Sequence, residues 1–258
     1  MLETEYALGD YLQDNRVIKV NSEQRKRMVI LLEELVRKRR YRRETLFLAV
    51  SLADRYLVTL TVSERPAPCL VNLAVTCLLL AAKLNQPLRP KFDLMNRLLQ
   101  QDYDVTVKTE DFLALEMDIL KVLKFDLQFV SPLPFLDRYQ RVFGLDLEEA
   151  DSASRKVGAL ARDFCLFMQR EAHFLQFRPS QQAAAALVLA VKTHHFFDHA
   201  PPKWHYSQAT SIESDFALRM WTPEIEAMTT LSVRDDIKPV YRLLESTVRY
   251  TSIAANAT

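Results

Sequence analysis

Four histidines are the residues of this chain whose types and spacing come closest to a metal or catalytic site. His194, His195, His199 and His205 cluster with Asp198 among them, and His195 and His199 are one helical turn apart. Two imidazoles on one face of a helix could begin a zinc site. No glutamate stands in HExxH order, however, and two prolines interrupt the pattern before His205. A polar helix end leading into a loop is the favoured interpretation, and an enzyme at this cluster is the weakest alternative.

The scarcity of glycine excludes several large enzyme classes. Only 3 of the 258 residues are glycine, and all are isolated. No phosphate-cradling GxGxxG or GxxxxGK[ST] loop and no GxSxG nucleophile motif can therefore be written. Because the chain carries no recognisable nucleophilic or acid–base motif either, we predict no catalytic residue, no metal site and no cofactor.

The densest charge lies at 37–43, where six basic side chains surround one tyrosine. Such a run could bind phosphate groups of nucleic acid. The simpler interpretation is that cations at the end of a helix complement the negative end of its dipole. With 34 basic and 33 acidic residues, the chain also lacks the basic surplus of most nucleic-acid-binding proteins.

Two single charges stand in otherwise apolar surroundings. Lys83 closes a long uncharged segment, and Glu116 projects beside a hydrophobic stripe. Arg25 and Asp54 are placed in a similar way. Taken alone, these residues favour ion pairs within the fold over a binding surface.

The elements that must position these charges are helices, because apolar residues recur with helical spacing along the chain. Prolines, at 66/68, 87/90, 132/134 and 201/202, separate the helical segments. The strings CLLLAAK at 77–83 and ALVLAVK at 186–192 match, which indicates an internal repeat. We therefore predict an all-α fold of two stacked five-helix domains. The predicted helices begin near 22, 44, 69, 92, 109, 133, 149, 180, 222 and 232.

Two further expectations concern burial. In the helix that begins at Thr109, the predicted buried stripe is Leu113, Met117, Leu120 and Leu123. The three cysteines, Cys69, Cys77 and Cys165, are expected to be buried free thiols because each has apolar neighbours.

The predicted organisation has four parts. Residues 1–20 form an N-terminal helix and linker, 21–129 and 130–250 the two helical domains, and 251–258 a tail. The acidic N-terminus lacks the features of a signal peptide, and no apolar stretch reaches the roughly 20 residues of a membrane span. We therefore expect a soluble intracellular protein.

Several motifs, taken in order, resemble those of the cyclin family, and of A/B-type mitotic cyclins in particular. ETLFLAVSLADRYL at 44–57, CLLLAAKL at 77–84 and LEMDILKVLKFDL at 115–127 are similar to motifs of the first cyclin box. FRPSQQAAAALVLAV at 177–191 and WTPEI at 221–225 are similar to motifs of the second cyclin fold. The resemblance extends over about residues 5–250.

The resemblance implies a regulatory subunit without catalytic activity that activates a cyclin-dependent Ser/Thr protein kinase in cell-cycle control. It implies a location in the nucleus, the cytoplasm or both. Arg25 and Asp54 would form an internal ion pair. The residues that would bind the kinase are Lys83, Glu116, Leu84, Leu120, Phe125 and Leu127.

The family's docking groove for Arg-x-Leu peptides of substrates or inhibitors is altered here. The aligned positions are Gln24, Arg27, Met28, Leu31 and Glu34. Arg27 would place positive charge where a cationic peptide docks, so we expect changed recognition. The alternative function is a transcription-factor-like adaptor of the same fold that binds nucleic acid through 37–43.

Overall fold

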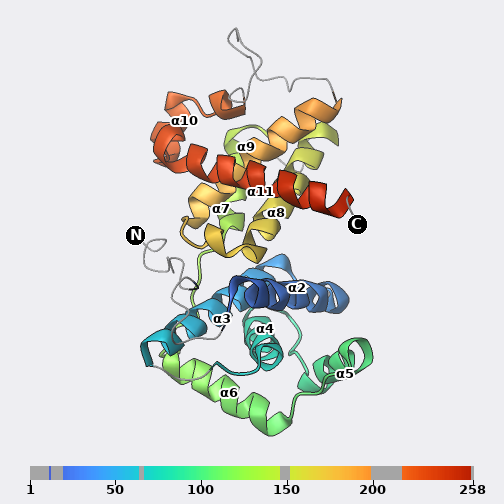
Figure 1. The fold of residues 1–258 in the computed structure, drawn as a ribbon. Helices are drawn as coiled ribbons and strands as arrows, with labels where there is room; N and C mark the ends of the chain where they lie inside the picture. The colour runs from blue at the N-terminus through green and yellow to red at the C-terminus, as the bar shows by residue number, and fades with distance from the viewer. Residues whose placement is uncertain (1–11, 13–19, 64–66, 146–151, 199–216, 257–258) are drawn as a thin grey trace.

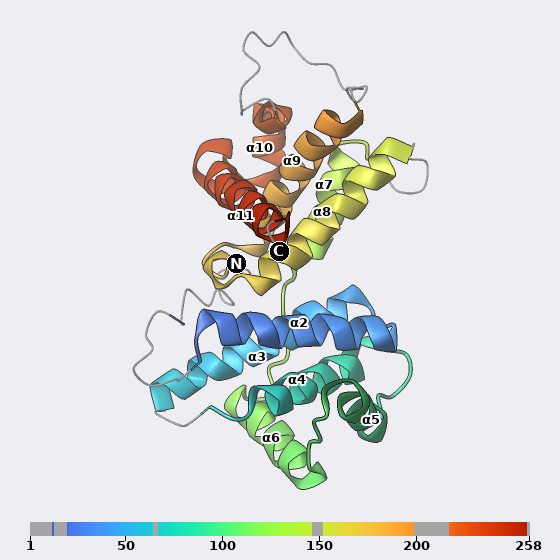
Figure 2. The same ribbon diagram turned by 45° about the vertical axis from the view of Figure 1, so that its right-hand side comes forward.

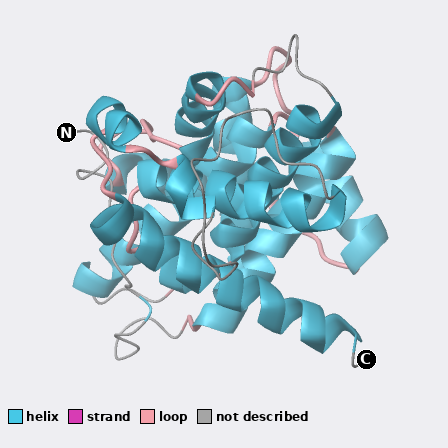
Figure 3. Ribbon diagram, turned by 90° about the horizontal axis from the view of Figure 1, so that it is seen from above, coloured by secondary structure: helices cyan, strands magenta, loops and turns pink. Residues whose placement is uncertain are grey.

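The computed structural model describes residues 12, 20–63, 67–145, 152–198 and 217–256, and these form helices and loops without any strand (Figure 3). The predicted all-α fold of two tandem domains is confirmed (Figure 1). The first half contains α2 (Ser22–Arg39), α3 (Arg43–Ser63), α4 (Leu70–Asn85), α5 (Phe92–Tyr103) and α6 (Thr109–Val122). The second half contains α7 (Pro132–Val142), α8 (Ser152–Arg170), η2 (Ala172–Phe174), α9 (Pro179–Asp198), η3 (Ala217–Met220), α10 (Pro223–Thr229), η4 (Val233–Ile237) and α11 (Lys238–Asn256).

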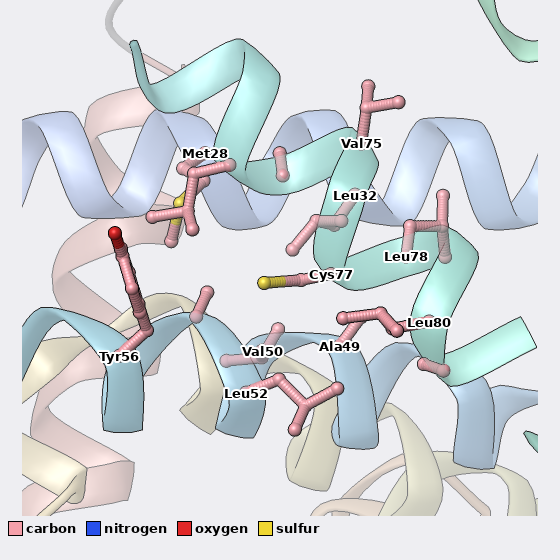
Figure 4. Packing of buried hydrophobic residues seen from close by; sticks show 14 of the residues in the cluster. Met28, Leu32, Ala49, Val50, Leu52, Tyr56, Val75, Cys77, Leu78 and Leu80 are labelled. Carbon is pink, nitrogen blue, oxygen red and sulfur yellow. The ribbon is translucent and has the colours of Figure 1, made fainter. Parts of the chain in front are cut away.

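Helix α4 is the centre of the first core because it has no polar face over most of its length. Its residues from Leu73 to Ala82 are all buried, and the helix packs against α2, α3 and α6. Figure 4 shows Cys77 of α4 facing side chains of α2 and α3, among them Met28 and Tyr56. A helix that is apolar all round must be surrounded by other helices, because only then are all its side chains removed from water.

Helix α9 occupies the same central place in the second core. The alanines at 183–186 are fully buried, and α9 packs against α7, α8 and α11. Small side chains let neighbouring helices approach closely. Gly158 of α8 serves the same purpose, since a Cβ atom there would lie 3.0 Å from the side-chain nitrogen of Gln140.

The two halves meet where the C-terminal end of α8 reaches α2 (Figure 2). Phe47 of α3 is fully buried in the second core rather than the first. Among the described residues, three ion pairs cross the junction as well: Lys26 to Glu171 at 2.5 Å, Arg170 to Glu33 at 2.5 Å, and Arg43 to Asp163 at 3.5 Å. The halves are therefore joined by both apolar and charged contacts.

Some sequence expectations differ from the structure at the ends of elements. The predicted N-terminal helix and linker over 1–20 falls almost entirely outside the described residues. Helix α11 runs to Asn256, past the predicted start of the tail at 251. Cys77 and Cys165 are buried, but Cys69 is exposed because it precedes the first residue of α4 instead of lying within the core. Among the described helices, none combines the length and apolar character needed to cross a membrane.

Candidate binding surface

The buried face of α6 is only partly the predicted one. Phe112, Leu115 and Ile119 are the buried residues of this helix, whereas Leu113 and Met117 are about half exposed. Leu123, just after the helix, is buried as predicted and Leu120 is half-buried. The prediction was wrong for Leu113 and Met117 because α6 carries two apolar stripes, and periodicity alone does not say which one meets α4. The second stripe is left facing solvent.

The predicted charges Lys83 and Glu116 are brought together beside that second stripe. Lys83 Nζ, at the end of α4, donates to Glu116 Oε1 at 2.5 Å, and the ammonium lies 6.0 Å from the ring centroid of Phe112. The Lys83 side chain is 36% exposed and that of Glu116 is 15% exposed. Lysine has three N–H donors. Glu116 takes one, and no other described side chain takes a second.

Large apolar side chains stand in solvent on both sides of this ion pair. Leu84, next to Lys83, is 55% exposed, and Phe125, just after α6, is 65% exposed. Leu113 and Met117 flank Glu116 along the helix. We call this set the open face: Leu84, Leu113, Met117 and Phe125 around the Lys83–Glu116 pair. Monomeric proteins rarely leave such apolar groups clustered in water unless they serve a partner.

The backbone that presents Phe125 is itself unusual. Lys124 and Phe125 have positive φ angles of 53° and 58°, a conformation that costs a bulky residue of order 1 kcal/mol or more. Arg55 of α3 holds the segment by donating to Asp126 at 3.2 Å and to the Gln128 carbonyl at 3.0 Å. The strained turn therefore holds an aromatic side chain outward, and Arg55 is a positioning residue that the sequence analysis missed.

The two remaining predicted contact residues, Leu120 and Leu127, are half-buried against the first core. Leu127 and Leu84 also line a groove of about 410 Å³ between the halves. Its other lining residues are Glu44, Leu48, Asn85, Phe129, Val130, Ser131 and Pro134. The groove extends the open face toward α7.

Arg25 and Asp54 form a bidentate, fully buried ion pair. Arg25 Nε donates to Asp54 Oδ1 at 2.8 Å and Nη2 donates to Oδ2 at 2.7 Å. The third guanidinium nitrogen, Nη1, donates to the Gln169 carbonyl at 2.9 Å. Because buried charge is costly unless all its donors are satisfied, this pair fixes α2 against both α3 and the end of α8.

The five residues aligned with the family's peptide groove all lie on α2. Met28 is buried in the core, and Gln24 forms the capping box of α2 with Asn21. Arg27 is exposed and donates to Glu23 at 3.0 Å. Glu34 accepts a hydrogen bond from Tyr103, and burial together with this bond raises the pKa of Tyr103 to about 12. Leu31 is half-buried. Apart from Met28, these residues keep exposed surface on α2, and their use as a docking groove stays a prediction.

The basic run over 37–43 ends α2 and begins α3. Lys38 binds Asp102 at 2.8 Å, and the Arg39 guanidinium lies 5.9 Å from the ring centroid of Tyr41. Arg37 is exposed and has no ion-pair partner among the described residues. The run is thus partly neutralised by its own neighbours.

The histidine cluster is only partly described. Helix α9 continues through Asp198, and His194 is buried within it. His199 and His205 lie outside the described residues. Within the described ranges, no group of three or more His, Cys, Asp or Glu side chains is arranged to hold a metal ion.

The described residues thus form two repeated helical domains, and the first of them carries the charged and apolar open face. Comparison with known families gives a match to the cyclin N-terminal domain over residues 2–128 and to the cyclin C-terminal domain over residues 130–257. The chain therefore belongs to the cyclin family, as the motifs predicted.

The relatives and a solved structure agree with this assignment. The chain is 29% identical to human G2/mitotic-specific cyclin-B3 over 93% of its length and 16% of the relative. It is 30% identical to the chicken protein of the same name over 80% of its length and 47% of the relative. It thus spans less than half of either relative. A viral cyclin from herpesvirus saimiri has the same fold, with a TM-score of 0.65 at 14% identity, covering 95% of this chain and 97% of the viral one.

Proposed function

We propose that this chain is a regulatory subunit that binds a cyclin-dependent Ser/Thr protein kinase and activates it allosterically in cell-cycle control. Membership of the cyclin family and the similarity to proteins named G2/mitotic-specific cyclins support this proposal. The observation that carries it is the open face, where an ion pair with spare donors stands among exposed apolar side chains. Such a regulator would act in the nucleus or the cytoplasm.

The open face has the composition of an interface that is both strong and specific. Burying each large apolar side chain contributes roughly 1.5 to 3 kcal/mol, so Leu84, Met117 and Phe125 supply the driving force. Lys83 and Glu116 fix the register, because an unmatched partner would leave their charges desolvated without hydrogen bonds. The free donors of Lys83 suit carbonyl or carboxylate oxygens of the kinase.

The mechanism needs no catalytic group on this chain. In the family, the cyclin box presses against a kinase helix, which completes a lysine–glutamate ion pair in the kinase and reorders its activation segment. A rigid surface is suited to this task, because the free energy of docking can then move the kinase helix instead of deforming α4 and α6. Buried Arg25 and the packed core of α4 supply that rigidity.

Calorimetric titration against a panel of purified cyclin-dependent kinases tests the proposal. We expect Lys83→Ala and Glu116→Ala to weaken binding to the cognate kinase by roughly 2 to 5 kcal/mol, with a parallel loss of phosphorylation of a peptide substrate. Lys91→Ala, which removes another exposed lysine at the start of α5, is the matched control and should bind normally.

Two results would count against the proposal. If no kinase of the panel binds the wild-type chain, the proposed function is wrong. If one binds and both variants bind it as well as the wild type does, the function stands but the open face is not the contact surface. Circular dichroism of the variants checks that the fold is retained.

A further inference from the structure

A second surface, unrelated to the open face, lies in a cleft between the two halves. The cleft has a volume of about 580 Å³ and shares no lining residue with the groove beside Leu84. Residues of α2 and the start of α3 form one wall, residues of α8 form the other, and Val248 of α11 also lines the cleft. Ligand-binding pockets commonly measure about 300 to 1,000 Å³, so the space admits one or two large side chains.

The floor of the cleft is apolar. Its residues come from both halves: Val36, Leu46, Phe164, Leu166 and Phe167. Val36, Leu46 and Phe164 are buried, while Leu166 and Phe167 are half-buried. Tyr41 completes the wall at the basic run. An apolar floor favours the binding of aliphatic or aromatic groups and does not favour the binding of a phosphate backbone.

The mouth of the cleft is basic, and one cation there has no ion-pair partner in the part of the chain that the structure describes. Arg170 and Glu33 neutralise each other at 2.5 Å. Arg43 and Asp163 are 3.5 Å apart and about half exposed, so their attraction is weak and easily exchanged for another partner. Arg37 lines the mouth and has no ion-pair partner among the described residues. The charge left over is therefore positive.

The cleft is also separate from the family's peptide groove. Val36 and Arg37 face α8, whereas Gln24, Arg27 and Leu31 stand on other positions around α2. The basic run at 37–43 is not part of the proposed kinase-binding surface. Three of its residues, Arg37, Tyr41 and Arg43, line this cleft instead.

We propose that this cleft binds an acidic peptide segment of a partner protein, with its leucine or phenylalanine side chains on the floor and its carboxylates on Arg37 and Arg43. Charge complementarity selects this occupant over a basic peptide. Glu33 and Asp163 at the same mouth disfavour nucleic acid, because its regularly spaced phosphates would be repelled by these two carboxylates. A peptide can place its few acidic side chains next to Arg37 and Arg43 and away from Glu33 and Asp163.

Fluorescence anisotropy with the full chain tests this inference. The probe is a short fluorescein-labelled peptide in which a leucine–phenylalanine pair is flanked by glutamates. One control peptide replaces the apolar pair by alanines, and another replaces the glutamates by lysines. We expect binding of the first peptide alone, and a loss of about tenfold or more in affinity, equal to about 1.4 kcal/mol, in Arg37→Glu.

Arg42→Glu is the matched control for Arg37→Glu. Both are exposed arginines of the same run, but Arg42 does not line the cleft. Equal losses in the two variants would show general attraction to the basic run and overturn the proposal. Binding of labelled duplex DNA in preference to the acidic peptide, reduced by either variant, would overturn it in favour of a nucleic acid.

A floor variant separates the cleft from its charged rim. Phe167→Ala keeps every charge and should lower the affinity for the acidic peptide by about tenfold. Thermal melting of the variant checks that the fold is retained. If Phe167→Ala melts early, Leu166→Ala gives the same test. Unchanged affinity in a folded floor variant would show that the apolar cavity is not occupied.

Discussion

The two halves of this cyclin carry corresponding lysine–glutamate pairs with opposite surroundings. The lysines close the matching strings of the central helices α4 and α9. Lys83 binds Glu116 of α6 at 2.5 Å, and Lys192 binds Glu245 of α11 at 2.6 Å. Both pairs thus join the third helix of a repeat to the fifth.

The pairs differ in what completes them. Lys192 also donates to the Tyr241 hydroxyl at 2.8 Å and is 8% exposed. At the comparable place beside Lys83 stands Phe112, whose ring offers no hydroxyl acceptor. In the second half, groups of the same domain surround the lysine–glutamate pair, and we call this the closed pair. In the first half the Lys83 side chain remains 36% exposed, and we call this the open pair.

The difference shows how one repeated motif serves two ends. A lysine whose donors are satisfied inside the fold stabilises that fold, because its removal takes a hydrogen-bond donor away from largely buried acceptors. A lysine with free donors among exposed apolar groups contributes little to its own domain and is available to a partner. Spare hydrogen-bonding capacity, more than the ion pair itself, distinguishes the proposed kinase-binding surface.

The largest expected effect is on stability, and it should fall on the closed pair. Lys192→Ala removes the buried ammonium that donates to both Tyr241 and Glu245, while Arg249 still donates to Glu245 at 2.8 Å. We therefore expect the free energy of unfolding to drop by about 3 kcal/mol, at the low end for a broken buried pair. Lys83→Ala should cost less than about 1 kcal/mol because its pair is partly exposed. Urea denaturation of both variants measures this. Equal losses would remove the distinction between the two pairs.

A smaller effect should separate the exposed apolar residues of the two halves. Phe125→Ala is expected to weaken kinase binding by about 2 kcal/mol while leaving stability unchanged, since the ring is in solvent. Met228→Ala is the matched control, because Met228 of α10 is 55% exposed and lies outside the open face. Calorimetric titration with the cognate kinase distinguishes them, and a loss in Met228→Ala alone would move the interface to the second half.

The smallest expected effect is a dependence of stability on alkaline pH. Burial by itself lowers the pKa of Lys192, but hydrogen bonds with Glu245 and Tyr241 outweigh it and raise the pKa above the ordinary 10.5. The charged form is thus favoured in the folded state, so this stabilisation is complete below pH 10.5 and is lost as the pH rises through the higher folded-state pKa. Urea unfolding across this range should show a steeper decline for the wild type than for Lys192→Met. If the free energy of unfolding declined equally with pH in the wild type and in Lys192→Met, this prediction would be contradicted.

The fold was predictable from the sequence because its signals are local. Proline positions, the all-apolar strings of α4 and α9 and the recurrence of apolar residues every three or four positions fix the helices one by one. Capping residues such as Asn21 set where they begin. The cyclin motifs, read in order, then identified the family and the two tandem domains.

Burial on α6 was not predictable, and the candidate site depended on it. Leu113 and Met117 have the spacing of a core stripe, yet Phe112, Leu115 and Ile119 meet α4 instead. Which of two apolar stripes is buried depends on how the neighbouring helix packs, and that information is not local. Cys69 was misjudged for the same reason.

The sequence by itself determined the helices, their repetition and the presence of single charges at Lys83 and Glu116. Only the tertiary structure decided which pair stayed open, because Tyr241 reaches Lys192 through the packing of α11 on α9. It also decided that the basic run opens onto an apolar cleft, since that cleft exists only where α8 meets α2. Residue types set which contacts are available, and packing between distant segments sets which of them are left for a partner.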